Sequence, residues 1–241
     1  MNDLLRVDDL HIRYRTIEAV KGVTFSVAAG DRVCILGSNG AGKSSIVRAL
    51  AGMVKPARGR IMFGAGQTNI TSWSAWKRAR AGFAIVPEGG RVFRDLTVRE
   101  NIQLGAYSQR GLPGEQRIRE TVEVFPAMAD RLDERAGSLS GGQQQMVAIA
   151  RALVSQPQVL IVDEVTSGLA PILVDEVFAA LRELPDRYAL TLIVVEQNAV
   201  RALAISERAI ILDRGVVVAD ESAETFRNSS TLLDAYLGAE Q

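Results

Sequence analysis

The chain has 241 residues, and its 28 Lys and Arg residues balance 28 Asp and Glu residues, so its formal net charge is zero. A neutral chain has no electrostatic footprint for nucleic acid, so we expect no nucleic-acid partner. The length allows a sizeable core in one large domain over 1–241, and the single cysteine, Cys34, excludes a disulfide within the chain. We expect no membrane span, because no apolar run approaches the roughly 18 residues that one requires.

Residues 4–52 predict strands, a glycine-rich loop and a helix, in that order. Residues 4–30 alternate between apolar and polar side chains and end in Ala-Ala-Gly, which indicates strands joined by a turn. Residues 33–36 form a short apolar run typical of a buried strand, and residues 46–50 are compatible with a helix that ends at Gly52. A glycine loop between a strand and a helix is a setting in which backbone N–H groups bind phosphate.

The loop at 37–44 reads G-S-N-G-A-G-K-S and fits the nucleotide phosphate-binding pattern G-x-x-x-x-G-K-[ST]. Small residues let backbone N–H groups close round phosphate oxygens. Lys43 adds a positive charge for the β- and γ-phosphates, and Ser44 offers a hydroxyl ligand to Mg²⁺. The alternative is a glycine-rich turn that binds nothing. The residues predicted to bind nucleotide here are Gly37, Ser38, Asn39, Gly40, Ala41, Gly42, Lys43, Ser44 and Ser45.

Residues 58–86 predict short strands, and residues 95–155 are rich in helical patterns with a loop at 111–114. Between them, Trp73 and Trp76 are expected to pack in the core or on the surface. The charged residues beside them are expected to form a solvated face; they are Lys77, Arg78 and Arg80.

The stretch 139–143 reads L-S-G-G-Q and precedes apolar residues at the i, i+3, i+4, i+7 spacing of a helix. Ser140 suits a helix N-cap, and Gly141 and Gly142 leave backbone N–H groups open. This helix start is therefore a second candidate anion site, and the alternative is a simple capped helix.

The apolar run 159–162 predicts a buried strand that ends in Asp163 and Glu164. In an α/β sheet, an acid at the carboxyl end of a strand faces the crevice that binds ligands. Asp163 can hold Mg²⁺ and Glu164 can polarise an attacking water. The alternative is an acidic pair that merely ends the strand.

The remaining chain returns to alternating elements. An amphipathic helix is expected after Pro171, residues 192–195 form another apolar strand, and residues 210–218 read as a hairpin. Together the elements predict an α/β fold with a nucleotide-binding core, an antiparallel β subdomain and an inserted helical subdomain near 90–155.

In this order, the motifs resemble those of ATP-binding cassette (ABC) ATPases, the nucleotide-binding subunits of ABC transporters, over nearly the whole chain. More narrowly, the chain is similar to the LivF type, the second ATPase subunit of branched-chain (hydrophobic) amino acid importers. The resemblance implies a RecA-like phosphate-loop NTPase core. The stretches that carry the narrower likeness are 86–89, 96–101, 144–153, 168–171, 195–198 and 235–238.

The resemblance also implies roles for single residues. An aromatic at the position of Tyr14 stacks on adenine in this family; the alternative is an aromatic on a half-buried strand. Glu88 stands where most ABC ATPases carry a Gln near Mg²⁺, and Gln197 stands where most carry a His near the γ-phosphate. The expected metal ligands are Ser44, Glu88 and Asp163, and the expected catalytic residues are Glu164 and Gln197.

By the same resemblance, the protein is an ATPase that uses ATP and Mg²⁺ to energise uptake of branched-chain or related apolar amino acids. Its expected partners are a second ATPase subunit in a head-to-tail dimer, two membrane permease subunits and, indirectly, an extracytoplasmic substrate-binding protein. In that dimer, ATP bound by one subunit would meet the L-S-G-G-Q motif of the other, and the expected contacts within that motif are Ser140, Gly141, Gly142 and Gln143.

The implied location is peripheral, at the cytoplasmic face of the inner membrane. Phe93 and Leu96 are expected contacts of the permease, with core packing as the alternative. Two alternative functions remain open. One is a weakly hydrolysing subunit paired with an active paralogue, and the other is an importer of amides or urea.

Overall fold

The computed structural model describes residues 3–107 and 114–229. The closing stretch 235–238 and most of the expected loop at 111–114 lie outside these residues. Within the described part, the larger sheet has the order β10-β9-β3-β8-β7-β6, in which β10 is antiparallel to β9 and the other pairs are parallel. Its strands are β3 (Arg32–Leu36), β6 (Phe83–Val86), β7 (Val159–Asp163), β8 (Thr191–Glu196), β9 (Arg208–Asp213) and β10 (Val216–Ser222).

The register of this sheet aligns the carboxyl ends of its central strands. Leu36 pairs with Glu196, and Asp163 pairs with Val195. The phosphate loop after β3 and the acidic pair after β7 therefore meet at one edge, where parallel α/β sheets bind ligands.

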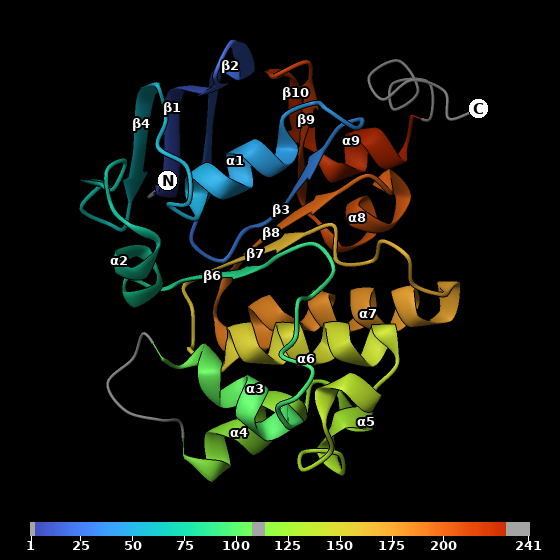
Figure 1. The fold of residues 1–241 in the computed structure, drawn as a ribbon. Helices are drawn as coiled ribbons and strands as arrows, with labels where there is room; N and C mark the ends of the chain where they lie inside the picture. Colours follow the sequence, from blue (N-terminus) through green and yellow to red (C-terminus); the bar gives the residue numbers. More distant parts are fainter. Residues whose placement is uncertain (1–2, 108–113, 230–241) are drawn as a thin grey trace.

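The smaller sheet is antiparallel, with the order β2-β1-β4-β5. Its strands are β1 (Asp3–Tyr14), β2 (Ile17–Ala28), β4 (Arg58–Phe63) and β5 (Thr68–Asn69). The strands predicted within 4–30 are thus confirmed as the β1–β2 hairpin. Helix α1 (Lys43–Leu50) lies between the two sheets and shares one core with them (Figure 1).

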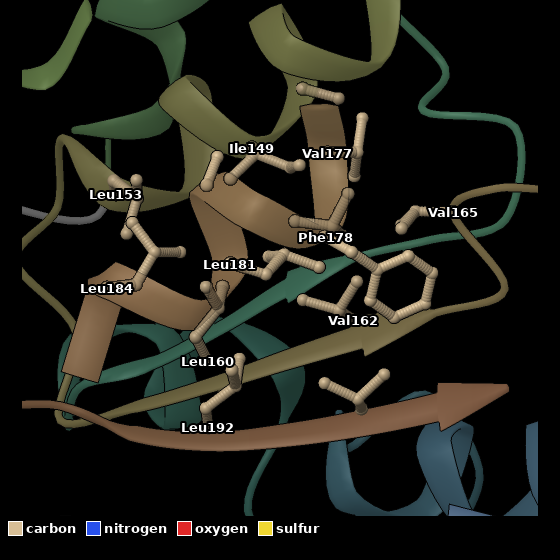
Figure 2. Packing of buried hydrophobic residues seen from close by; sticks show 14 of the residues in the cluster. Ile149, Leu153, Leu160, Val162, Val165, Val177, Phe178, Leu181, Leu184 and Leu192 are labelled. Atoms are coloured by element: carbon tan, nitrogen blue, oxygen red, sulfur yellow. The ribbon is translucent and has the colours of Figure 1, made fainter. Parts of the chain in front are cut away.

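The opposite face of the larger sheet is covered by α6 (Gly141–Leu153), α7 (Pro171–Tyr188) and α8 (Ala199–Ile205) (Figure 1). Figure 2 shows Leu181 of α7 close to Leu160 and Val162 of β7, and Leu184 of α7 beside Leu153 of α6. The helix predicted after Pro171 and the hairpin predicted at 210–218 are both confirmed.

Further helices pack beyond α6, at the end of the molecule remote from the small sheet (Figure 1). They are α3 (Val98–Gly105), α4 (Glu115–Val122), α5 (Pro126–Ala129) and the 3₁₀ helix η1 (Ala136–Ser138). The helical pattern of 95–155 and the α/β fold class are confirmed, while the subdomain limits near 90 and 155 stay a prediction. Two short helices complete the described chain, α2 (Ala75–Arg80) and α9 (Ala223–Arg227).

The prediction that the charged residues beside the tryptophans form a solvated face is wrong for Arg78, because this side chain is only 1% exposed. Its guanidinium donates to the carbonyl oxygens of Ala49 and Leu50, both at 2.7 Å, and of Ile70 at 2.9 Å. The first two carbonyls belong to the last turn of α1, where carbonyls have no partner within the helix; that of Ala49 also accepts from the Gly52 N–H at 3.1 Å. Arg78 is buried because it satisfies them, and this burial lowers its pKa to about 10.

Candidate functional site

The phosphate loop joins β3 to α1 at the carboxyl edge of the larger sheet (Figure 1). Gly42 is the N-cap of α1 with a φ of 106°, and a Cβ atom there would lie 2.7 Å from the carbonyl oxygen of Ala19. Only glycine meets both conditions. Among the described residues no side chain caps α1, and the Ser45 N–H donates to the Gly42 carbonyl oxygen at 3.1 Å, so the N–H groups of Lys43 and Ser44 stay available to an anion.

Lys43 is 4% exposed and lies under this loop. Its Nζ donates to the carbonyl oxygens of Gly37 at 2.7 Å and Ser38 at 3.2 Å. The same Nζ lies 3.2 Å from Oε1 of Glu164. The ammonium therefore reaches the acidic pair, at the place where phosphate oxygens would compete with Glu164 for it.

Glu164 occupies an unusual backbone conformation, with a φ of 44°. A left-handed backbone at a residue other than glycine costs of order 1–3 kcal/mol and is concentrated at functional sites. Nε2 of Gln197 donates to Oε2 of Glu164 and to Oδ1 of Asn39, each at 2.8 Å. Both carboxylate oxygens are thus held, one by Lys43 and the other by Gln197.

Asp163 ends β7 and is 8% exposed, and its Oδ1 has no hydrogen-bond partner within the described chain. Burial, followed by the negative charges of Glu164 and Glu88, raises the pKa of Asp163 to about 6. An unpartnered, buried carboxylate oxygen suits a hard divalent cation.

The donor set fits Mg²⁺ shared with a nucleotide. In the described chain no group of three or more His, Cys, Asp or Glu side chains is placed to hold a metal. Mg²⁺ is usually held by one or two carboxylates together with substrate phosphates and waters, so it needs no such protein cage. Asp163, Ser44 and Glu88 supply oxygen ligands of the required kind.

Ser44 and Glu88 line a cavity of about 620 Å³, a size usual for small-molecule sites, whereas Asp163, Gly37 and Ser38 are not part of its wall. Tyr14, at the end of β1, lines it with an exposed ring. Ala19 and Ser167 also line it and were not predicted, because neither residue type signals a nucleotide in a sequence. The predicted residues in the wall are Tyr14, Asn39, Gly40, Ala41, Gly42, Lys43, Ser44, Ser45, Glu88, Glu164 and Gln197.

The start of α6 does not line this cavity. Ser140 is the N-cap of α6, as predicted, and forms a reciprocal capping box with Gln143. The Gln143 N–H donates to Oγ of Ser140 at 3.3 Å, and the Ser140 N–H donates to Oε1 of Gln143 at 3.1 Å. The helix start is thus a separate, well-formed feature of the surface.

Glu196 is a buried acid beside the site that sequence reasoning missed. It ends β8, is 3% exposed, and accepts hydrogen bonds from Oγ1 of Thr166 at 3.0 Å and from the Gln197 N–H at 3.3 Å. Burial raises its pKa. Its signal in the sequence is a charge that directly follows the apolar run 192–195.

The family model of the ABC transporter matches residues 20–167. The chain is 36% identical to the high-affinity branched-chain amino acid transport ATP-binding protein BraG of Pseudomonas aeruginosa, over 98% of this chain and 100% of the relative. It is 33% identical to the probable branched-chain amino acid transport ATP-binding protein LivF of Archaeoglobus fulgidus, over 91% of this chain and 92% of the relative.

Solved structures share the whole fold. An ATP-binding cassette of an ABC transporter in its ADP conformation matches with a TM-score of 0.85 and 25% identity, over 99% of this chain and 100% of that one. A dimeric cassette in a post-hydrolysis state with ADP and Pi matches with a TM-score of 0.80 and 26% identity, over 91% and 98%. In the described residues, no helix is long and apolar enough to cross a bilayer. Since the family model spans more than half of the chain and the relatives align along nearly their full length, the chain belongs to the ABC transporter family and is an ATP-hydrolysing subunit of that family.

Proposed function

We propose that this chain hydrolyses Mg-ATP to drive the import of branched-chain or related apolar amino acids through separate membrane subunits. The observation that carries the ATPase chemistry is the set of contacts that joins Lys43, Glu164, Gln197 and Asn39 in one cavity. The substrate class rests on two relatives named for branched-chain amino acid transport. These names favour apolar amino acids over amides or urea.

Nucleotide binding uses groups that are already in place. The open N–H groups of α1 and the ammonium of Lys43 bind the phosphates, and Lys43 exchanges Oε1 of Glu164 for a phosphate oxygen. The exposed ring of Tyr14 stacks on adenine, which contributes about 1–3 kcal/mol. Ser44, Asp163 and Glu88 would hold Mg²⁺, which would supply positive charge to the phosphate oxygens when bound.

When Lys43 binds a phosphate oxygen, the carboxylate of Glu164 becomes available to act as a base. Oε1 of Glu164 can then accept a proton from the attacking water, while Gln197 keeps hold of Oε2. Gln197 is itself fixed by Asn39 and, through its backbone N–H, by Glu196. A neutral amide can orient a carboxylate or a γ-phosphate, but it cannot supply the positive charge of a His.

The start of α6 serves the ATP of a second subunit in a head-to-tail dimer. Ser140 and Gly141 are exposed and stand apart from the chain's own cavity. The capped helix end offers N–H groups to an anion that approaches from outside. Dimeric cassettes among the similar structures support this arrangement.

The membrane subunits dock on an apolar groove beside the site. A cavity of about 410 Å³ is bordered by Phe93, Leu104 and Tyr107. Phe93 is 54% exposed, whereas Leu96 is half-buried, so the contact surface is centred on Phe93. A short cytosolic helix of a permease subunit fits such a groove and would hold this chain at the cytoplasmic face of the membrane.

Uptake by intact cells tests this proposal. A strain without this gene should lose leucine uptake and keep glutamine and urea uptake. The wild-type gene should restore leucine uptake, and Lys43→Ala should not, because its phosphate-binding charge is gone. Loss of urea or amide uptake instead would contradict the substrate class, and full rescue by Lys43→Ala would contradict the ATP site.

A further inference from the structure

Glu196 is a buried acid that joins the two segments from which Glu164 and Gln197 extend. Its side chain is 3% exposed. Its Oε1 accepts a hydrogen bond from Oγ1 of Thr166 at 3.0 Å, and its Oε2 accepts one from the Gln197 N–H at 3.3 Å. Thr166 follows Glu164 by two residues on the segment after β7, and Gln197 is the first residue after β8. One carboxylate therefore bridges the segments that carry the two expected catalytic side chains.

Glu196 does not line the nucleotide cavity. It lines a second cavity, of about 350 Å³, whose wall also contains Thr166, Glu164 and Gln197. The wall of the nucleotide cavity contains Glu164 and Gln197 but neither Glu196 nor Thr166. Glu164 and Gln197 are thus shared by both cavities, whereas Glu196 can affect a bound nucleotide only through its neighbours.

The side chain of Gln197 has to be held on Glu164. Gln197 is exposed, and a glutamine side chain has several rotatable bonds, so a single fixed conformation has an entropic cost. The Glu164 N–H donates to the carbonyl oxygen of Val195 at 2.8 Å, which joins the two segments at one point. The carboxylate of Glu196 joins them at a second point, beyond the end of β8. It thereby fixes the backbone from which the Gln197 side chain starts.

The chemistry of Glu196 indicates a function beyond packing. Burial raises the pKa of Glu196, and no cation of the described chain is among the groups that lower it. Arg201 lines the same cavity but is paired with Asp175 at 2.8 Å. A buried acid without a cation is costly for stability, and such acids are concentrated at functional sites. A leucine at this position would fill a similar volume but leave the donors of Thr166 and Gln197 unpaired.

We propose that Glu196 is a positioning residue for ATP hydrolysis, which holds the segments after β7 and β8 together so that Gln197 stays on Glu164. Its effect is exerted through Gln197 and not on the nucleotide. This inference rests on the proposed roles of Glu164 and Gln197 in the ATP site.

A double-mutant cycle tests this inference, because a residue that acts through another loses its effect when the second residue is removed. In the assembled transporter, Glu196→Leu should lower the single-turnover rate of ATP hydrolysis by about 10²-fold, the scale expected when a reacting group is displaced by about 1 Å. In a Gln197→Ala background, Glu196→Leu should cause no further loss. The affinity of Glu196→Leu for ATP should stay at the wild-type value, since Glu196 does not line the nucleotide cavity.

Glu196→Gln is the conservative variant and should keep nearly wild-type turnover. Its amide oxygen can accept from the Gln197 N–H, while its amide nitrogen donates to Oγ1 of Thr166. Thr166→Val removes one of the two bonds and should lower turnover in the wild-type background only. It takes the place of Glu196→Leu in the cycle if that variant does not fold. Asp175→Leu is the matched control, because Asp175 is an exposed acid paired with Arg201 beside the same cavity, and it should leave turnover unchanged.

The possible results distinguish this inference from the ATP site on which it rests. Wild-type turnover in Gln197→Ala would refute the role of Gln197 in the site, and the inference with it. If Gln197→Ala is slow, wild-type turnover in Glu196→Leu, or an equal fractional loss in both backgrounds, would refute the positioning role and leave the ATP site standing. Turnover as slow in Glu196→Gln as in Glu196→Leu would also refute it, because the charge and not the pair of hydrogen bonds would then be required.

Discussion

Lys43 and Glu164 form an ion pair that the proposed reaction has to break. Nζ of Lys43 is 3.2 Å from Oε1 of Glu164 and is bound to two loop carbonyls as well. A phosphate has more oxygens and more negative charge than one carboxylate. The bound nucleotide therefore displaces Glu164 from the ammonium of Lys43. Glu164 keeps its hydrogen bond from Gln197. Its left-handed backbone, together with this bond, fixes the orientation of its side chain.

Glu164→Gln should keep nucleotide affinity but lower turnover by about 10²–10⁴, the usual contribution of a positioned acid–base group. The amide has the shape of the carboxylate but cannot accept the proton, and it no longer competes as an anion for Lys43. Single-turnover hydrolysis and equilibrium titration with ATP measure the two effects. Glu176→Gln, an exposed substitution on α7, is the control and should change neither. Near-normal turnover in Glu164→Gln would remove Glu164 from the role of base.

His11 gives the small sheet a stability that depends on pH. Its Nδ1 lies 2.9 Å from Oε1 of Glu18 and its Nε2 lies 3.1 Å from Oδ1 of Asp9. The hydrogen bond to Glu18, assisted by Asp9, raises the pKa of His11. A raised pKa in the folded state stabilises the fold fully below the ordinary value of about 6.5, and this stabilisation is lost as pH rises through the folded value.

The difference in unfolding free energy between wild type and His11→Gln should therefore be larger near about pH 6 than near about pH 9. Chemical denaturation at the two values measures it, with Val218→Gln as a control for an exposed strand substitution. An equal difference at both values would mean that the pKa of His11 is the same in the folded and unfolded states.

At the scale of elements, apolar runs predicted the strands but not the faces of the strands. The run 159–162 is continuous because β7 is covered on both sides. In the structure Val159 and Ile161 face α1 and the small sheet, while Leu160 and Val162 face α6 and α7 (Figure 2). A continuous run has no period, so only the fold decides which residue faces which layer.

Helices α3 and α6 approach so closely that one glycine is required between them. A Cβ atom at Gly105 would lie 1.7 Å from the carbonyl oxygen of Arg151. Gly105→Ala should destabilise the protein by about 1–3 kcal/mol through overpacking, although helix propensity alone would favour Ala by nearly 1 kcal/mol. Urea unfolding measures the change.

Gly66→Ala is the control for this substitution, since no heavy atom lies within 4 Å of its added Cβ. It should change the free energy of unfolding by only a few tenths of a kcal/mol. A stabilising Gly105→Ala would show that the two helices separate more easily than their packing indicates.

At the scale of the whole molecule, the sequence predicts those parts of the site whose residues are contiguous in the chain. It does not predict the parts that form where distant segments come into contact. The phosphate loop and the acidic pair carry their function in contiguous residues. Arg78 and Arg151 do not: Arg78 looked like part of a charged face, and the contacts of Arg151 join residues 60 and 61 positions apart. Both arginines donate to backbone carbonyl oxygens. Because every residue has such an oxygen, nothing in the sequence indicates which residues these arginines will contact.

Contacts of Asn101 and Arg151 hold Phe93 in the groove on which a membrane partner would dock. Oδ1 of Asn101 accepts from the Phe93 N–H at 2.8 Å, and its Nδ2 donates to the Phe93 carbonyl oxygen at 2.9 Å. Cζ of Arg151 also lies 5.7 Å from the centre of the Phe93 ring. Phe93 is therefore an exposed apolar side chain on a fixed backbone, which lowers the entropy lost when a partner binds it.

Phe93→Asp should abolish co-purification with the membrane subunits while ATP affinity stays at the wild-type value. The change replaces the apolar ring that the partner contacts with a charged side chain, which would have to lose its hydration inside the groove. The free protein should fold normally, because the Phe93 ring is already 54% exposed and its backbone hydrogen bonds do not depend on the side chain. Val218→Asp, on the exposed edge strand β10, is the matched control and should leave the complex intact. If the complex survives Phe93→Asp, the groove is not the docking surface; if ATP binding is lost as well, Phe93 supports the nucleotide site rather than the partner.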